Sequence, residues 1–229
     1  MNALLQILPT FTVWAIAGLG IAAVVIVIER VQALYFKYSL DSESFLEKIK
    51  GLILSDKIGE AVNLAAAHEH VPVGKVTKSL LERANRDDEA IQQALDISLS
   101  EAVPLLTRRL GFLNMIANVA TLFGLLGTIT GLIIAFQAVS TVDASQKQTI
   151  LTQGISLSMN TTAFGLSVAI PVMIIYSVLQ AKQADMIEKL SGGAAKVLDY
   201  LLARNYRGFD RNDVFSAPKV EPPSADKVS

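Results

Sequence analysis

Residues 110–142 read LGFLNMIANVATLFGLLGTITGLIIAFQAVSTV, a run of 33 positions without a charged side chain. About 20 apolar residues cross the roughly 30 Å hydrocarbon core of a bilayer, so this run is long enough to span it. Residues 148–181 form a second uncharged run and residues 11–28 a third. The sequence therefore predicts an all-α membrane protein with three transmembrane helices.

The composition agrees with a membrane protein. Apolar residues make up 52% of the 229-residue chain and charged residues 18%, and the mean hydropathy is +0.44. The net charge of −1 argues against a nucleic-acid partner, because a phosphate-binding surface needs an excess of basic residues. The first run ends in Glu29 and Arg30 instead of a small-residue cleavage site, which favours a retained span over a signal peptide.

Basic residues predict the orientation. Of 20 Lys and Arg residues, 11 lie in 29–109 and 8 follow residue 181, whereas the loop between the second and third runs holds only Lys147. The positive-inside rule places the side with most basic residues in the cytoplasm. We therefore expect the N-terminus outside the cell and the C-terminus in the cytoplasm.

The segments outside the lipid are expected to be helical. Phe45, Ile49 and Ile53 form one apolar stripe, and the acidic residues from Asp87 suit the first turn of a helix that runs into the second span with a kink at Pro104. The expected organisation is an N-terminal segment with the first span (1–36), a cytoplasmic helical domain (37–109), the second span (110–140), a periplasmic loop (141–148), the third span (149–181), a cytoplasmic C-terminal helix (182–206) and a disordered tail (207–229).

The second span carries small or polar residues at alternating steps of three and four, which places them on one face. They are Asn114, Ala117, Thr121, Gly124, Thr128, Gly131 and Ala135. Small faces let membrane helices approach closely, and Gly127 with Gly131 also makes a G-x-x-x-G spacing. This face predicts either a helix-packing seam or a row of hydroxyls beside a hydrated interior, and spacing alone leaves both open.

The third span is polar in its outer half. A narrow face of small and hydroxyl residues comprises Gly154, Ser158, Thr161, Thr162, Gly165 and Ala169. Many of the polar side chains here, Asn160 included, must face protein or water, because acyl chains offer them no hydrogen bonds. Pro171 lacks the backbone donor for the Ser167 carbonyl, which predicts a local kink.

The ionisable residues that ion transport and enzymes use are absent from the three runs, which contain no Asp, Glu, Lys, Arg or His. A proton relay normally needs a titrating group at depth, so a partner would have to supply it. We expect no enzyme activity, no catalytic residue and no cofactor. His68 and His70 do not share a helical face, so we expect a solvated helix end there and no metal site.

The residues LFGLLGTITGLIIAF (122–136) and GISLSMNTTAFGLSVAIPVMIIY (154–176) resemble the two signature spans of the ExbB/TolQ/MotA proton-channel family, and the three-span layout is similar to its ExbB/TolQ branch. The resemblance implies a homopentamer whose second and third spans line a pore. It also implies an ExbD/TolR-like single-span partner whose membrane Asp carries the proton. By position, the pore threonines of the family fall on Thr128 and Thr162. Leu157 stands where a Glu is common.

The expected function is that of a stator-like proton-channel subunit in a bacterial inner membrane, which uses the proton motive force to drive envelope machinery. We expect Thr128 and Thr162, with Asn160, Thr161 and Thr121, to line the path, because neutral hydroxyls orient water without trapping a proton. Gly124, Gly127, Gly131 and Gly165 are expected to pack helices. The alternatives are a passive membrane scaffold or a solute-transporter subunit. Besides its protein partners, the chain is expected to contact membrane lipid.

Overall fold

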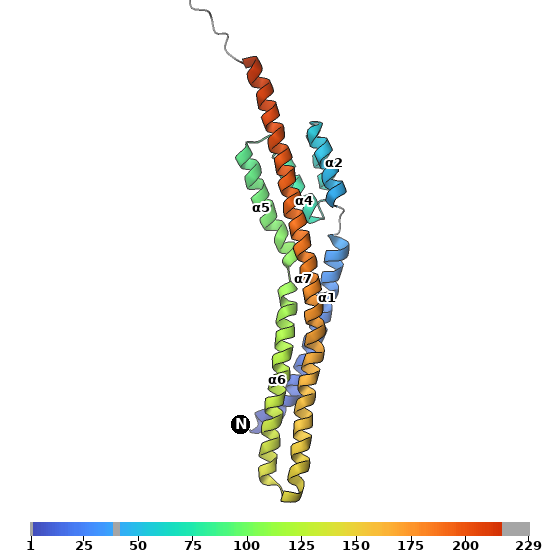
Figure 1. Cartoon of the computed structure of the whole chain (residues 1–229), viewed down its shortest axis with the longest axis vertical. Coiled ribbons are helices and arrows are strands. Elements are labelled where there is room, and N and C mark those ends of the chain that lie inside the picture. Colours follow the sequence, from blue (N-terminus) through green and yellow to red (C-terminus); the bar gives the residue numbers. More distant parts are fainter. Residues whose placement is uncertain (1, 39–41, 217–229) are drawn as a thin grey trace, which may run out of the picture. The chain divides into compact units, whose positions relative to one another are not determined.

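The computed structural model describes residues 2–38 and 42–216, and every regular element in this part of the chain is helical (Figure 1). The chain divides into two compact units. Unit 1 comprises the described residues of Met1–Ser39 and Val103–Glu188, and unit 2 those of Leu40–Ala102 and Lys189–Ser229. By length and composition, three helical stretches among the described residues could cross a membrane, within Thr10–Phe36, Asp88–Ser140 and Ala144–Tyr206. The predicted all-α class with three spans is confirmed.

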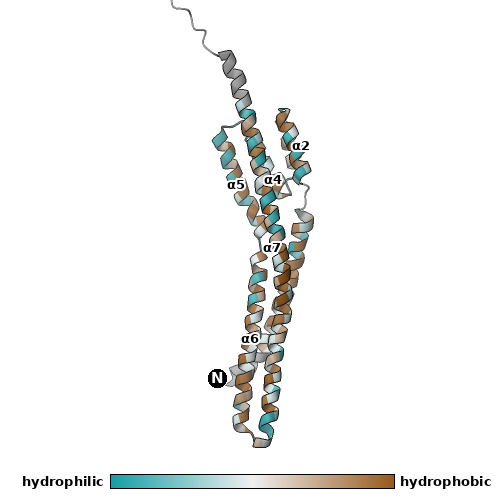
Figure 2. Ribbon diagram, viewed as in Figure 1, coloured by the Kyte–Doolittle hydropathy of each residue, from teal (hydrophilic) through white to brown (hydrophobic). Residues whose placement is uncertain are grey.

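Unit 1 is built from three long apolar helices. Its elements are α1 (Asn2–Val31), the π-helical η1 (Gln32–Lys37), α6 (Leu110–Thr141) and the first part of α7 (Ala144–Ser216). Figure 2 shows mainly hydrophobic residues along the described parts of α1 and α6. Large apolar side chains such as Trp14 and Leu122 are 72% and 62% exposed, as expected of surfaces that face lipid or another membrane helix.

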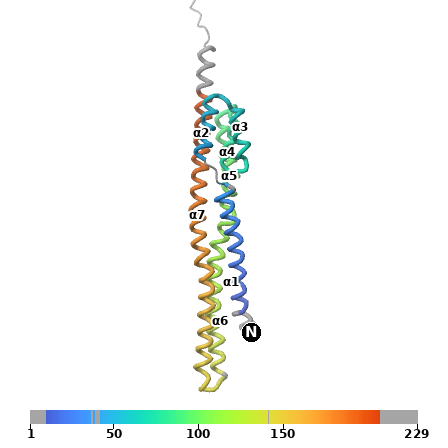
Figure 3. Tube along the Cα trace, turned by 90° about the vertical axis from the view of Figure 1, so that its right-hand side faces the viewer, coloured from blue at the N-terminus to red at the C-terminus, as the bar shows by residue number. Residues whose placement is uncertain are grey.

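Helices α6 and α7 form an antiparallel hairpin, and they run side by side in both views of the chain (Figures 1 and 3). Only Val142 and Asp143 separate them, so the connection is shorter than the loop expected over 141–148. Helix α1 packs against both members of the hairpin. The rings of Phe11 and Phe123 meet edge to face at 6.2 Å, and a Cβ on Gly20 would lie 3.5 Å from Val168.

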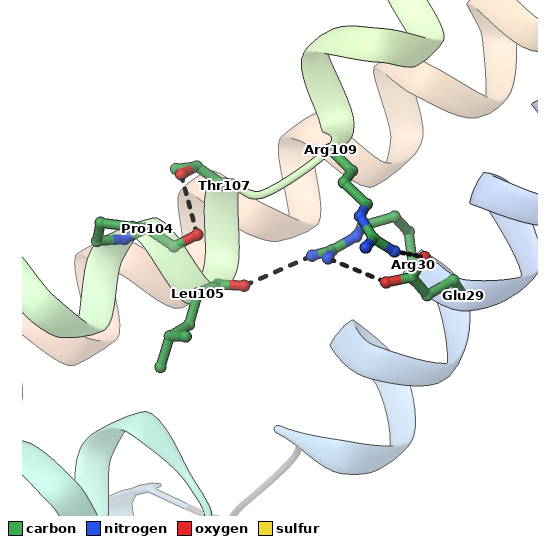
Figure 4. Close-up of polar contacts among 6 residues, drawn as sticks. All are labelled: Glu29, Arg30, Pro104, Leu105, Thr107 and Arg109. Atoms are coloured by element: carbon green, nitrogen blue, oxygen red, sulfur yellow. Dashed lines mark hydrogen bonds and ion pairs between the residues drawn. The ribbon is translucent and has the colours of Figure 1, made fainter.

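The expected continuous helix into the second span is wrong, because α5 (Asp88–Thr107) ends before α6 begins. Pro104 lies inside α5, and the break comes at Arg109, whose φ of 63° is left-handed. Contacts from the end of α1 stabilise this break (Figure 4). The Arg109 guanidinium donates to the Glu29 carboxylate, and the buried Arg30 donates to the Leu105 carbonyl at 3.5 Å. Arg109 thus takes the left-handed position that glycine usually occupies after a helix end, and contacts from α1 hold it there.

Unit 2 consists of α2 (Ser42–Leu54), α3 (Ile58–Ala67), α4 (Pro72–Leu81), most of α5 and the later part of α7. The predicted stripe on α2 is confirmed, since Phe45, Ile49 and Ile53 are at most 5% exposed. Helix α4 starts at its proline, whose missing N–H costs nothing in a first turn. The predicted acidic start of α5 is also found, with Asp88 and Glu89 in its first turn.

The later part of α7 stays helical through Gly192 and Gly193 and continues to Ser216. A Cβ on Gly193 would lie 2.8 Å from Leu46 Cδ1, so this glycine allows α7 to approach α2. The C-terminal helix predicted over 182–206 is therefore part of one longer helix. That helix extends into the segment expected to be a disordered tail, whose remainder, 217–229, lies outside the described residues.

Arg204 on α7 ties two loops of unit 2 together. Its Nε donates to Asp56 Oδ1 at 2.7 Å, and its Nη1 donates to Asn85 Oδ1 at 3.0 Å. Asp56 has a left-handed φ of 58°, which aspartate tolerates better than most residues. One planar side chain can satisfy both acceptors because a guanidinium carries five donors in a fixed fork.

Replacing Arg204 by alanine is expected to destabilise the chain by about 1–2 kcal/mol, because charge-assisted bonds to two loops are lost together. Arg204→Lys should recover only part of this, since an ammonium cannot copy the fork. Thermal unfolding of the detergent-purified chain, followed by circular dichroism, measures the change. The control is Lys57→Ala, which removes an exposed pair with Glu60 and should leave the midpoint nearly unchanged.

Candidate functional site

The hairpin of α6 and α7 is held by close contacts at glycine. A Cβ on Gly165 would lie 2.8 Å from the Ala120 carbonyl oxygen and 3.0 Å from the Gly124 Cα. A Cβ on Gly127 would lie 2.1 Å from Thr161 Cγ2, and one on Gly131 would lie 2.9 Å from the Ser158 Cβ. Hydrogen is therefore the only substituent that fits at these positions without movement of the neighbours.

The single face predicted on the second span is divided in the structure. Its small members are buried, and all but Ala117 lie close to residues of α7: Ala117, Gly124, Gly131 and Ala135. Its polar members lie at the edge of the contact, since Asn114 and Thr128 are half-buried and Thr121 is exposed. The face thus combines a packed line of small residues with a neighbouring line of polar ones.

Thr162 connects the two helices by a hydrogen bond. Its Oγ1 donates to the Gly124 carbonyl at 3.0 Å, from α7 to α6. The α-helical pattern directs the backbone N–H of Thr128 to the same carbonyl, four residues back. The Thr128 hydroxyl donates to the Leu125 carbonyl at 2.6 Å. The structure therefore links the two threonines through the carbonyl of Gly124.

Both threonines lie on the side of the hairpin away from α1. Phe123 of α6 and Val168 of α7 both lie against α1. At about 100° per residue, Thr128 lies about 140° around its helix from Phe123, and Thr162 lies about 120° from Val168. Thr121, two turns before Thr128, shares this side. Its hydroxyl donates to the Ala117 carbonyl at 3.0 Å.

The remaining candidate residues lie elsewhere on α7. Thr161 is 4% exposed inside the contact with α6, and its hydroxyl donates to the Leu157 carbonyl at 3.0 Å. Asn160 is exposed and lies about 160° around the helix from Thr162, so the two do not share a face. Three other exposed polar residues lie near the face of Asn160: Gln153, Ser156 and Ser167.

These hydroxyls can accept hydrogen bonds without binding a proton. A threonine hydroxyl that donates to a carbonyl keeps lone pairs that can accept a hydrogen bond from water or from a protonated carboxyl. Leu157, at the position where a Glu is common in the resembling family, is 57% exposed and adds no charge. Residues 110–142 and 148–181 contain no Asp, Glu, Lys, Arg or His.

Sequence reasoning overlooked two buried polar residues of unit 1. Thr130 is 3% exposed and its hydroxyl donates to the Leu126 carbonyl at 2.9 Å, while Thr12 on α1 is fully buried. Thr130 lies two helical turns after Phe123 and shares its face. The small residues predicted from the sequence lie on a different face, so they gave no indication of Thr130. Pro171, expected to kink the third span, lies within α7, which stays helical on both sides of it.

Comparison with known proteins shows which protein family the chain resembles. Residues 66–191 match the profile of the MotA/TolQ/ExbB proton channel family. The chain is 26% identical over 177 residues to a putative biopolymer transport protein ExbB homolog of Methanothermobacter thermautotrophicus, covering 77% of this chain and 62% of the relative. It is 38% identical over 84 residues to biopolymer transport protein ExbB of Helicobacter pylori (37% and 57%). It is 32% identical over 115 residues to Tol-Pal system protein TolQ of Haemophilus influenzae (48% and 50%). The alignments thus cover less than two thirds of each of these relatives.

Proposed function

Since the chain belongs to the MotA/TolQ/ExbB proton channel family, we propose that it is the proton-conducting subunit of a motor driven by the proton motive force. In this proposal it resides in a bacterial inner membrane and passes energy to envelope machinery through an ExbD/TolR-like partner. The observation that carries the proposal is the pair Thr128 and Thr162, linked through the Gly124 carbonyl on the side of the hairpin away from α1.

The partner is needed because the spans of this chain lack a proton carrier. Hydroxyls have no accessible pKa near neutral pH, so they can pass a proton along water but cannot store one. A carboxylate from a second protein, placed beside Thr128 and Thr162, would be protonated from one side of the membrane and deprotonated to the other. The lone pairs of both hydroxyls would accept from its neutral form, and their rotated O–H groups would donate to its charged form.

Several copies of the chain would enclose this path. One hairpin carries Thr128 and Thr162 on one side only. The remaining walls of the proton path would therefore come from other chains. The exposed polar residues on the Asn160 face would be poorly solvated by lipid, which supports their burial against a neighbouring copy in the proposed homo-oligomer. The distribution of basic residues supports an outside N-terminus and an inside C-terminus.

Proton flux in liposomes tests the proposal. The chain would be reconstituted with an ExbD/TolR-like single-span protein that carries a membrane Asp, and a pH-sensitive dye would report acidification under a membrane potential. The double variant Thr128→Val/Thr162→Val keeps the shape but loses both hydroxyls, so its flux should fall clearly. The control Thr128→Ser/Thr162→Ser keeps the hydroxyls and should conduct. Equal flux from the Val variant and the unmodified chain would show that the pore assignment is wrong.

A passive scaffold is the second candidate, and one observation favours it. The hydroxyls of Thr121, Thr128, Thr161 and Thr162 all donate to backbone carbonyls, as they would if their only role were to pack helices. A scaffold would carry no flux with or without a partner. It would also lose stability, but no conductance, in the Val variant.

A further inference from the structure

Unit 1 has an apolar groove between the end of α1 with η1 and α7. The groove has a volume of about 460 Å³, within the usual range of ligand pockets. Its lining contains only Val31, Tyr35, Phe36, Ile174, Ile175, Val178 and Leu179. Leu179 is 2% exposed, whereas Phe36 and Ile174 are 78% and 61% exposed. The groove is therefore an open channel with a closed apolar floor.

The local backbone helps to shape one wall. Residues 32–37 are π-helical, and the Tyr38 N–H bonds to the Ala33 carbonyl five residues back at 3.0 Å. This wider turn places both aromatic rings, Tyr35 and Phe36, in the lining. Short π-helical insertions of this kind are frequent at functional sites.

A positive charge lies at one end of the groove. Lys182 Nζ is 5.6 Å from the ring centroid of Tyr35, which is a lining residue. Lys182 is also the first charged residue after the uncharged run 148–181, so it marks the expected boundary between hydrocarbon and headgroups. Asp185 Oδ2 is 3.8 Å from the same Nζ and lies further along α7.

We propose that this groove binds an anionic phospholipid, with an acyl chain along Ile174 and Val178 and the phosphate at Lys182. An acyl chain matches a lining without polar side chains other than the Tyr35 hydroxyl, which belongs at the headgroup level. The ammonium complements an anionic headgroup, and the basic side of the chain is the side that faces the leaflet rich in anionic lipid. This lipid site does not depend on the proposed proton conduction.

Lipid binding to the full chain, purified in detergent, tests the site by native mass spectrometry. The probes are phosphatidylglycerol and phosphatidylcholine with identical acyl chains. The unmodified chain should retain phosphatidylglycerol preferentially. Lys182→Gln should reduce that preference about fivefold, the effect of one basic residue at an anionic surface. The control Lys147→Gln removes a lysine beyond the opposite end of the uncharged run and should leave the preference unchanged.

Two further variants make the result specific to the groove. Asp185→Asn removes the competing carboxylate beside Lys182, so it should strengthen the preference for phosphatidylglycerol. Val178→Trp fills the groove and should reduce binding of both lipids, and a retained circular dichroism spectrum would show that it folds. Equal retention of both lipids by every variant would overturn the proposal. So would cross-links from a photoreactive residue at Ile174 that capture a second copy of the chain and no lipid.

Discussion

Replacing Gly74 by alanine is expected to destabilise unit 2 by about 3 kcal/mol or more, the upper end of the cost of overpacking a core. A Cβ at this position would lie 2.1 Å from the His68 carbonyl oxygen and 2.6 Å from its carbonyl carbon. That carbonyl is backbone and already accepts from the Val71 N–H at 3.0 Å, so it cannot rotate away. The methyl group must push α4 off the turn that precedes it.

Helix α4 has little freedom to move. Seven of its residues are buried: Pro72, Val73, Gly74, Val76, Thr77, Leu80 and Leu81. A shift that relieves Gly74→Ala would therefore open space around Val76 and Leu80, which are fully buried. Each lost apolar contact adds to the cost because protein interiors are closely packed.

Gly59→Ala in α3 is the matched control for Gly74→Ala. It lies in the same unit, and an added Cβ would meet no atom within 4 Å. Alanine is better than glycine in a helix by about 0.5–1 kcal/mol, so this variant should be slightly stabilised. Thermal and chemical unfolding of the detergent-purified variants compare the two. A Gly74→Ala chain as stable as the unmodified one would contradict the contact on which this prediction rests.

Gly74 also shows what the sequence could not reveal. Val76 and Leu80 have the spacing of one helical face, and both are buried on α4. The close approach of the His68 carbonyl depends on how the turn before α4 folds back, which no local pattern encodes. The break at Arg109 was missed for a similar reason, because its support comes from Glu29 and Arg30, eighty residues earlier.

The three spans, by contrast, could be predicted directly from the uncharged runs. A helix that crosses a membrane needs such a run whatever tertiary contacts it makes. Within the spans, the steps of three and four residues pointed to Gly124 and Gly131, which lie close to α7 in the structure. They could not separate Gly124, which packs, from Thr128, which lies at the edge, because the two positions are only about 40° apart around the helix. Asn160 was grouped with Thr162 by closeness in sequence, although helical geometry puts them on different faces.

Gly165→Ala is expected to disrupt the α6–α7 hairpin and to lower proton flux, although every candidate hydroxyl remains. The added methyl would lie 2.8 Å from the Ala120 carbonyl oxygen and 3.0 Å from the Gly124 Cα. Both atoms are backbone, so the helices must separate, at a cost of about 1–3 kcal/mol. Separation also lengthens the bond of 3.0 Å to the Gly124 carbonyl from the Oγ1 of Thr162, which lies about one helical turn from Gly165.

Gly18→Ala is the control at a comparable position in a span, because its added Cβ meets nothing within 4 Å on α1. It should match the unmodified chain in thermal stability and in flux with the partner. Gly165→Ala should be lower in both, and Thr162→Val should be lower mainly in flux. A Gly165→Ala chain with normal stability and flux would mean that the close approach of the two helices is not needed for conduction.

Gly127→Ala tests whether the loss of stability in these glycine variants comes from a steric clash between α6 and α7. Here the clash is with a side chain, since the added Cβ would lie 2.1 Å from Cγ2 and 2.8 Å from Cβ of Thr161. Thr161→Gly removes both atoms, so the double variant Gly127→Ala/Thr161→Gly should regain part of the stability that Gly127→Ala loses. No side-chain replacement can rescue Gly165→Ala in this way, because its nearest neighbours are the backbone atoms of α6. Rescue in the first case and none in the second would show that backbone contact between α6 and α7 sets the spacing of the proposed pore helices.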